Sequence, residues 1–246
     1  YQVQDLLPVP VAETILDFYP IEPSPQAPDT EIRGLLVAAL KDAVETNVAA
    51  LSDAGLSVIQ VDLAPFAGIR AITQAAAPEG THTVVSIAPR TTTISVIKDG
   101  IPQFVRIVPA GGETITDAVA EILNADRATS EKVKRHLGLE QGADPRHKPV
   151  SQAMLDALKG IFGSIRSTNG YYLSNSTDDA VDSVILLGAE TALPGFARAV
   201  VEYVGLPVSV GRPLAGITVG PDVPAALIQR RELDLAVPIG LALGNA

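Results

Sequence analysis

The sequence predicts an α/β protein, and three observations indicate this fold class. First, hydrophobic residues make up 47% of the chain and aromatic residues only 4%, so Ala, Val, Leu and Ile must supply most of the core. Such side chains suit buried strands and Ala-rich helices. Second, segments typical of strands alternate along the chain with segments of helical periodicity. Third, 246 residues suffice for one large core or two modest ones.

Composition and charge exclude several classes of function. A formal net charge of −10 argues against binding to nucleic acid or anionic lipid, because both rely on Lys and Arg. The absence of Cys excludes disulfides and thiolate metal sites and fits a cytoplasmic protein. The three His residues are not spaced as a metal pair, so no metal site is predicted. The apolar run at 235–243 is too short to cross a bilayer.

The first part of the chain predicts a small mixed unit. Strand patterns, an amphipathic helix closed by Gly55 and a helix with Pro65 in its first turn follow one another. The expected elements are strands at 14–21 and 33–40, a helix at 41–55, a strand at 56–63 and a helix at 64–76. A linker at 77–82 is the expected domain boundary, which gives domains at 1–77 and 78–246.

The second part predicts three antiparallel strands followed by strand–helix units. Asp99-Gly100 is a strong signal for a hairpin between the second and third strands. The expected elements are strands at 81–88, 91–100 and 101–110, helices at 111–125, 129–139 and 151–168, a strand at 183–188, a helix at 195–204, a strand at 207–211 and a last helix ending at Leu243. Residues 126–150 should form a small helical sub-lobe. This order is the ribonuclease-H-like arrangement of the actin and Hsp70 ATPases.

The motifs resemble those of one actin-like family. "SIAPRTTTISVIKDGIPQFVRIVPAGGETIT" is similar to the second phosphate-loop segment of the PilM family of type IV pilus machines, and "SVILLGAETALPGFARAVVEYVGLPVSV" to its adenosine segment. "LDLAVPIGLALG" is similar to its closing helix, and residues 1–77 to its small inserted subdomain with a remnant of the first lobe. The resemblance covers nearly the whole chain. It implies an actin-like ATPase fold with a small inserted α+β subdomain, without the portion that carries the first phosphate loop.

The resemblance also implies a nucleotide site, with ATP and Mg²⁺ as the possible cofactors, but the phosphate loop departs from the family pattern. Ser86 stands at the position of the acid, and a hydroxyl cannot replace a carboxylate in holding hydrated Mg²⁺. Ala88 stands at the position of a glycine, where a positive φ would cost about 1–2 kcal/mol. Pro89 has no N–H to donate to a phosphate. No catalytic residue is therefore predicted, and ATP hydrolysis is not expected.

Other residues of this loop keep two interpretations. Arg90 could supply charge, and Thr91 and Thr92 keep hydroxyls that either contact phosphate or only form a β-strand ladder. Gly111-Gly112 could expose amides to an anion at a helix N-terminus, or form a plain tight turn.

The adenosine segment is altered as well. Gly188 is retained, but Ala189 and Glu190 replace the next two glycines and set a carboxylate near the nucleotide. By the resemblance, Glu131 and Lys134 correspond to the ribose-contacting pair. Their spacing alone is also typical of an exposed ion pair on a helix.

The function implied by the resemblance is that of a cytoplasmic adaptor on the inner-membrane pilus platform. Its small subdomain would receive the cytoplasmic tail of a PilN-like membrane protein, which would recruit it to the membrane together with other platform proteins. The stretch that includes Leu6, Leu7, Pro8 and Pro10 either lines the rim of a peptide groove or turns a helix end into a strand. The alternative function is an active ATP-binding or ATP-hydrolysing protein, FtsA-like or sugar-kinase-like.

Overall fold

The computed structural model describes residues 7, 9–21, 32–140, 145–176, 180–224, 226, 228 and 231–244. The chain divides into two compact units, Tyr1–Leu63 and Ala64–Ala246. This division falls before α2 (Ala64–Thr73), whereas the sequence placed the boundary in the linker after residue 77. The helix belongs to the second unit because it packs against α8 (Ala236–Leu243), where Arg70 Nε donates a hydrogen bond to the carbonyl of Gly240 at 2.9 Å.

The first unit is a β-hairpin followed by a helix. After the short helix η2 (Val11–Glu13), β1 (Thr14–Pro20) pairs antiparallel with β2 (Gly34–Leu40), and α1 (Lys41–Asp53) follows directly. The strand predicted at 56–63 is wrong: this segment has no regular secondary structure, and Ile59 is 97% exposed. An alternating pattern forms a strand only where another strand pairs with it, and β1 and β2 pair with each other.

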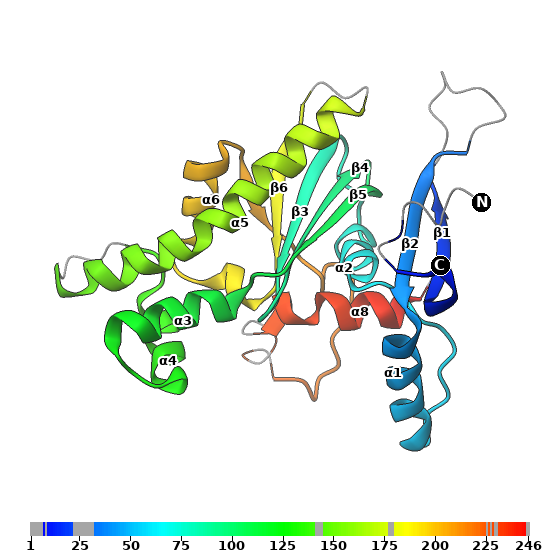
Figure 1. Cartoon of the computed structure of the whole chain (residues 1–246), viewed down its shortest axis with the longest axis horizontal. Helices are drawn as coiled ribbons and strands as arrows, with labels where there is room; N and C mark the ends of the chain where they lie inside the picture. The colour runs from blue at the N-terminus through cyan, green and yellow to red at the C-terminus, as the bar shows by residue number, and fades with distance from the viewer. Residues whose placement is uncertain are drawn as a thin grey trace. The chain divides into compact units, whose positions relative to one another are not determined.

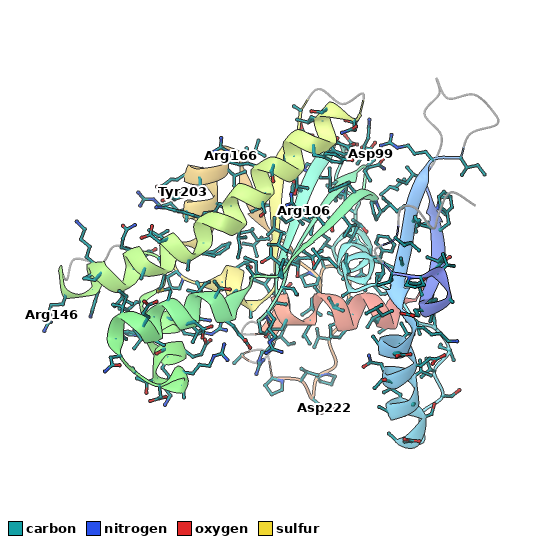
Figure 2. The ribbon with its side chains drawn as sticks, viewed as in Figure 1. Asp99, Arg106, Arg146, Arg166, Tyr203 and Asp222 are labelled. Atoms are coloured by element: carbon teal, nitrogen blue, oxygen red, sulfur yellow. The ribbon has the colours of Figure 1, made fainter. Side chains whose placement is uncertain are left out.

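The second unit is built on a five-stranded mixed sheet in the order β5-β4-β3-β6-β7. Its strands are β3 (Thr81–Ile87), β4 (Thr92–Lys98), β5 (Ile101–Val108), β6 (Ser183–Leu187) and β7 (Val208–Val210). The first three are antiparallel neighbours, and β6 and β7 continue the sheet in parallel. Asp99 and Gly100 both have positive φ, as the predicted two-residue hairpin requires. Figure 2 labels Asp99 at this turn and Arg106 on β5.

Helices cover both faces of this sheet (Figure 1). On one face, α5 (Lys148–Ser174) packs with α3 (Gly112–Leu123) and α6 (Phe196–Val204) over the larger apolar cluster. On the other face, Ile69 of α2 and Ala236 of α8 belong to a smaller cluster. Val84 and Val85 of β3 point into different clusters, so the central strand is buried on both sides. None of the described helices combines the length and apolarity that a bilayer span requires.

Two helices differ in their bounds from the prediction, α4 by a shift of two residues and α5 by its greater length. Helix α4 (Arg127–Leu137) begins two residues early because the side chain of Asp126 accepts a hydrogen bond from Thr129 N and caps it. This hydrogen bond lowers the pKa of Asp126. Helix α5 begins three residues before and continues six residues past the range predicted at 151–168, and in the added part Asn169 accepts a buried hydrogen bond from Thr83 Oγ1 at 2.7 Å.

Candidate functional site

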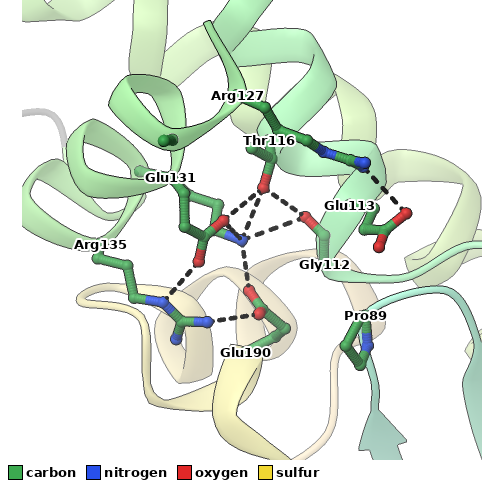
Figure 3. Close-up of a pocket in the computed structure, with 10 residues that line it drawn as sticks. Pro89, Gly112, Glu113, Thr116, Arg127, Glu131, Arg135 and Glu190 are labelled. Carbon is green, nitrogen blue, oxygen red and sulfur yellow. Dashed lines mark hydrogen bonds and ion pairs between the residues drawn. The ribbon is translucent and has the colours of Figure 1, made fainter.

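An open cavity of about 510 Å³ lies in the second unit, between α3, α4 and the turn after β6 (Figure 3). It is the region in which the resemblance places a nucleotide. Its walls carry both signs of charge, from Pro89, Gly112, Glu113, Thr116, Arg127, Ala128, Glu131, Lys134, Arg135 and Glu190. Glu190 belongs to the short helix η4 (Ala189–Ala192), which is separated from the end of β6 by Gly188 alone.

The bottom of the cavity is an ion-pair network that we call the floor cluster: Glu131, Lys134, Arg135 and Glu190. Lys134 Nζ lies 2.7 Å from Glu131 Oε2 and 2.9 Å from Glu190 Oε2. Arg135 joins the same two carboxylates through their other oxygens, at 2.7 Å each. The side chains of Lys134 and Glu190 are only 1% and 7% exposed. The cluster holds two positive and two negative groups, so its formal charge is zero.

Neutral groups complete the coordination of the buried lysine. Lys134 Nζ donates to Thr116 Oγ1 at 2.9 Å and to the carbonyl of Gly112 at 3.2 Å. An ammonium has three protons, and Gly112, Thr116 and Glu131 are sufficient to accept them. Glu190 Oε2 consequently receives no hydrogen bond and is held to Lys134 by charge alone. The predicted Glu131–Lys134 pair is therefore not the exposed ion pair that its spacing suggested, since its lysine is buried.

The floor cluster shifts the pKa values of Glu131 and Arg135. Burial acts to raise the pKa of Glu131, but hydrogen bonds from Lys134 and Thr116 and the charge of Lys134 outweigh it and lower this pKa to about 2. Burial acts to lower the pKa of Arg135, and the carboxylates of Glu190 and Glu131 raise it instead. Both groups are therefore charged at neutral pH.

Glu113 and Arg127 of the cavity wall belong to a second set of ion pairs, which also includes Arg90 and Asp117 and which we call the rim cluster. Arg127 lies 2.9 Å from the carboxylate of Glu113 and 3.3 Å from that of Asp117. Arg90 Nε lies 3.4 Å from the same Glu113, and its side chain is 83% exposed. These groups are solvated, unlike those of the floor cluster.

The corner after β3 uses its carbonyl groups to cap α3. Gly112 N donates to the carbonyl of Ala88 at 3.0 Å, and Glu113 N donates to that of Pro89 at 2.7 Å. A Cβ on Gly111 would lie 2.2 Å from the Ala88 carbonyl oxygen, so this close approach requires glycine. Of the two interpretations of Gly111-Gly112, the geometry favours the tight turn, because the first amides of the helix already have acceptors.

Ala88 does not have the strained backbone considered above. Among the described residues, Asp99 and Asn124 are the non-glycine residues with positive φ. The Ala88 amide donates to the carbonyl of Thr91 at 2.9 Å, which closes the corner as a turn. The Thr92 hydroxyl is buried and donates to the carbonyl of Ala110 at 2.8 Å. Of the two roles considered for this hydroxyl, phosphate contact and a structural role, this geometry favours the structural role.

The remaining predicted residues lie around the cavity. Ser86 is half-buried within β3, opposite Thr93 of β4 and Leu187 of β6, and Thr91 is exposed just before β4. Gly188 has a φ of +86°, and a Cβ there would lie 2.4 Å from the Ile87 carbonyl oxygen. Of the nine predicted nucleotide residues, Gly112, Glu131 and Lys134 line the cavity.

Sequence reasoning missed the roles of Thr116, Arg135, Glu113 and Arg127. The i,i+4 spacing of Glu131 and Arg135 was a usable signal for one pair, whereas no local pattern links Arg135 to Glu190. The described residues contain no group of three or more His, Asp or Glu that could hold a metal ion.

The predicted peptide residues lie in the first unit or outside the description. Leu7 is half-buried, and Pro10 is exposed and precedes η2, where its carbonyl accepts a hydrogen bond from Glu13 N at 3.0 Å. Leu6 and Pro8 lie outside the described residues.

Solved structures that resemble this fold include the following two. One is described as the PilM-PilN type IV pilus biogenesis complex; it shares 25% sequence identity, covers 98% of this chain and 69% of its own, and superposes with a TM-score of 0.83. The other is MreB5 of Spiroplasma citri bound to AMPPNP, with 14% identity, 83% of this chain and 64% of its own covered, and a TM-score of 0.63. These similarities confirm the predicted actin-like fold class.

Sequence comparison finds a relative and a family. The cell division protein FtsA of Streptococcus pneumoniae serotype 2 (strain D39 / NCTC 7466) is 22% identical over 196 residues, which are 73% of this chain and 43% of FtsA. The chain thus spans less than half the length of that relative. The profile of the type IV pilus assembly protein PilM matches residues 1–246. The order of motifs, the sheet topology and this match agree, and the chain belongs to the PilM family of type IV pilus assembly proteins.

Proposed function

We propose that this protein is a cytoplasmic adaptor that binds the N-terminal tail of a PilN-like membrane protein and does not hydrolyse ATP. Through that tail, the protein would be recruited to the inner face of the cytoplasmic membrane, where other proteins of the pilus assembly platform also contact it.

The observation that carries the proposal is the similarity to the PilM-PilN complex over 98% of the chain. The described part of the first unit supports peptide binding on physical grounds. It offers few enclosed apolar side chains, and Phe18, Leu36 and Leu40 are 40–54% exposed on its hairpin. Paired strands with exposed apolar side chains are a common platform for extended peptides.

The cavity supports the other part of the proposal, that the protein does not hydrolyse ATP. Its buried cation already has two carboxylate partners, and the amides at the start of α3 already have carbonyl acceptors. A phosphate chain would have to displace these partners before it could be bound. Ser86, on β3, offers no carboxylate to orient a Mg²⁺-bound water.

The test is a titration of the full natural chain with a fluorescent peptide of the cognate PilN-like N-terminal tail. We expect saturable binding of one peptide per protein, and no binding of a peptide with the same composition in scrambled order. Equal anisotropy changes with both peptides, or none with either, would refute the adaptor proposal.

The alternative, an ATP-hydrolysing protein, draws on the fold shared with MreB5, whose structure was solved with AMPPNP bound. It predicts ATP turnover that disappears on Thr91→Ala, because Thr91 is the exposed hydroxyl of the corner. The adaptor proposal predicts no turnover above that of the buffer for either protein. A phosphate-release assay separates the two.

A further inference from the structure

We propose that Glu190 is an internal anion: its carboxylate occupies the cavity floor and joins the two walls of the cavity, as an anionic ligand would. The inference rests on the proposed loss of nucleotide chemistry and gives that loss a specific residue. It also predicts that the cavity keeps one conformation whether or not nucleotide is present.

The first step is the bridge between the walls. Glu190 comes from η4, at the end of β6, and its carboxylate points across to α4 (Figure 3). There Oε1 accepts a hydrogen bond from Arg135 at 2.7 Å, and Oε2 lies 2.9 Å from Lys134 Nζ. Lys134 in turn donates to the carbonyl of Gly112 on α3. One carboxylate thus ties together the helical wall and the sheet wall.

The second step is the space that the carboxylate fills. A Cβ built on Gly112 would lie 2.4 Å from Cδ of Glu190 and 2.6 Å from its Oε1. Glu190 therefore lies in direct contact with the first residue of α3. A phosphate group brought to this position would meet both the volume and the negative charge of Glu190.

The third step is the charge balance. With Glu190, the floor cluster sums to zero; with a neutral residue in its place, it would carry one positive charge on or beside a lysine that is 1% exposed. An uncompensated buried charge is strongly unfavourable, so such a floor should take up an anion from solution. An oxygen of such an anion would take the place of Glu190 Oε2, which pairs with Lys134 Nζ at 2.9 Å and accepts no hydrogen bond.

The experiment measures hydrogen exchange of the amides of α4 in the full chain, with and without Mg-ATP or inorganic tripolyphosphate. For the wild type, we expect α4 protection that neither anion changes. For Glu190→Gln, which keeps the volume and removes the charge, we expect exchange faster by about tenfold or more, because the hydrogen bond from Arg135 becomes weaker and Lys134 loses a counterion. Either anion should restore protection in this variant.

Glu202→Gln is the matched control, because it removes a carboxylate from an exposed ion pair with Arg198 on α6. It should leave α4 exchange unchanged. If Glu190→Gln does not fold, the double variant Lys134→Met/Glu190→Gln takes its place, since it leaves no unpaired lysine; it should fold and show no response to either anion.

Three results would overturn the inference: wild-type α4 protected further by either anion, Glu190→Gln exchanging like the wild type, or the double variant responding to an anion. None of these measurements involves the PilN-like peptide. A peptide that fails to bind, together with α4 behaviour as expected, would therefore refute the adaptor proposal alone.

Discussion

The floor and the rim of the cavity contain the same chemistry in different surroundings. Both clusters pair basic side chains with carboxylates, at 2.7–2.9 Å in the floor and 2.9–3.4 Å at the rim. The decisive difference is burial, since Lys134 is 1% exposed and Arg90 is 83% exposed. Solvated pairs contribute little to stability, whereas a desolvated charge that loses its partner is costly.

This difference indicates that the charged groups of the cavity floor are already paired with one another, while the cavity stays open at its rim. The floor cluster joins α3, α4 and η4 through Lys134, which contacts Gly112 and Thr116 of α3, Glu131 of α4 and Glu190 of η4. The rim cluster can rearrange in solvent without breaking that framework. A ligand could therefore enter past the rim at low cost, but it would have to compete with Glu190 at the floor.

The largest expected effect comes from removing the cation at the floor. Lys134→Ala leaves Glu190 buried with Arg135 as its remaining cation, and we expect the free energy of unfolding to fall by about 3–5 kcal/mol. Lys132→Ala, an exposed lysine on the same helix, should change it by no more than about 0.5 kcal/mol. Urea unfolding followed by circular dichroism measures both, and equal losses would contradict the distinction between the clusters.

The next effect tests the contact between Glu190 and α3. Gly112→Ala places a methyl group within 2.4 Å of the Glu190 side chain, which two ion pairs hold in position. We expect a loss of about 1–3 kcal/mol, typical of overpacking. Gly160→Ala is the control, because Gly160 lies in α5 with no atom within 4 Å of an added Cβ. It should stabilise the protein by up to about 1 kcal/mol.

The third effect is the pH dependence of the floor cluster. The pKa of Glu131 is about 2 in the folded protein against an ordinary value of 4.5, so the unfolded chain binds its proton first as the pH falls. The ionised Glu131 therefore stabilises the folded protein, and this contribution to the free energy of unfolding is complete above pH 4.5 and is lost as the pH falls from there toward 2. We expect it to amount to about 1–2 kcal/mol, less than the full shift implies, because solvent screens a partly exposed carboxylate.

The check compares unfolding free energies at several pH values between 6.5 and 3 for the wild type and Glu131→Gln. The variant should be less stable at the upper end, and the difference should shrink toward acid. Glu121→Gln, an exposed carboxylate on α3, serves as the control. A Glu131→Gln difference that stays constant over this range would contradict the pKa.

Much of the fold could be predicted because its signals are local. Alternating apolar residues and the Asp99-Gly100 turn indicated the meander, and helical periodicity predicted the helix at 151–168, in which Met154 and Leu158 are fully buried. Alternation of apolar residues wrongly predicted a strand at 56–63, because a strand also needs a neighbouring strand to pair with. The helix predicted at 151–168 was also too short, and its added part contains Asn169, whose hydrogen-bond partner Thr83 is distant in the chain.

The site was less predictable because its decisive contacts are distant in the chain. Arg135 and Glu190 are 55 residues apart, and only the packing of α4 against η4 brings them together. The spacing of Glu131 and Lys134 indicated that they pair but could not reveal that the lysine is buried. The glutamate at 190 was visible in the sequence as a departure from glycine, and the structure adds what it contacts.

The smallest expected effect tests the rim. Arg127→Ala removes two exposed ion pairs, with Glu113 and Asp117, and we expect a loss of about 0.2–1 kcal/mol at low salt. Because solvated charges are screened within about 3 Å at 1 M salt, the loss should vanish there, while the loss from Lys134→Ala should largely persist. Unfolding of both variants at low and high NaCl measures this. A salt-independent loss for Arg127→Ala would mean that the rim, like the floor, is part of the rigid framework.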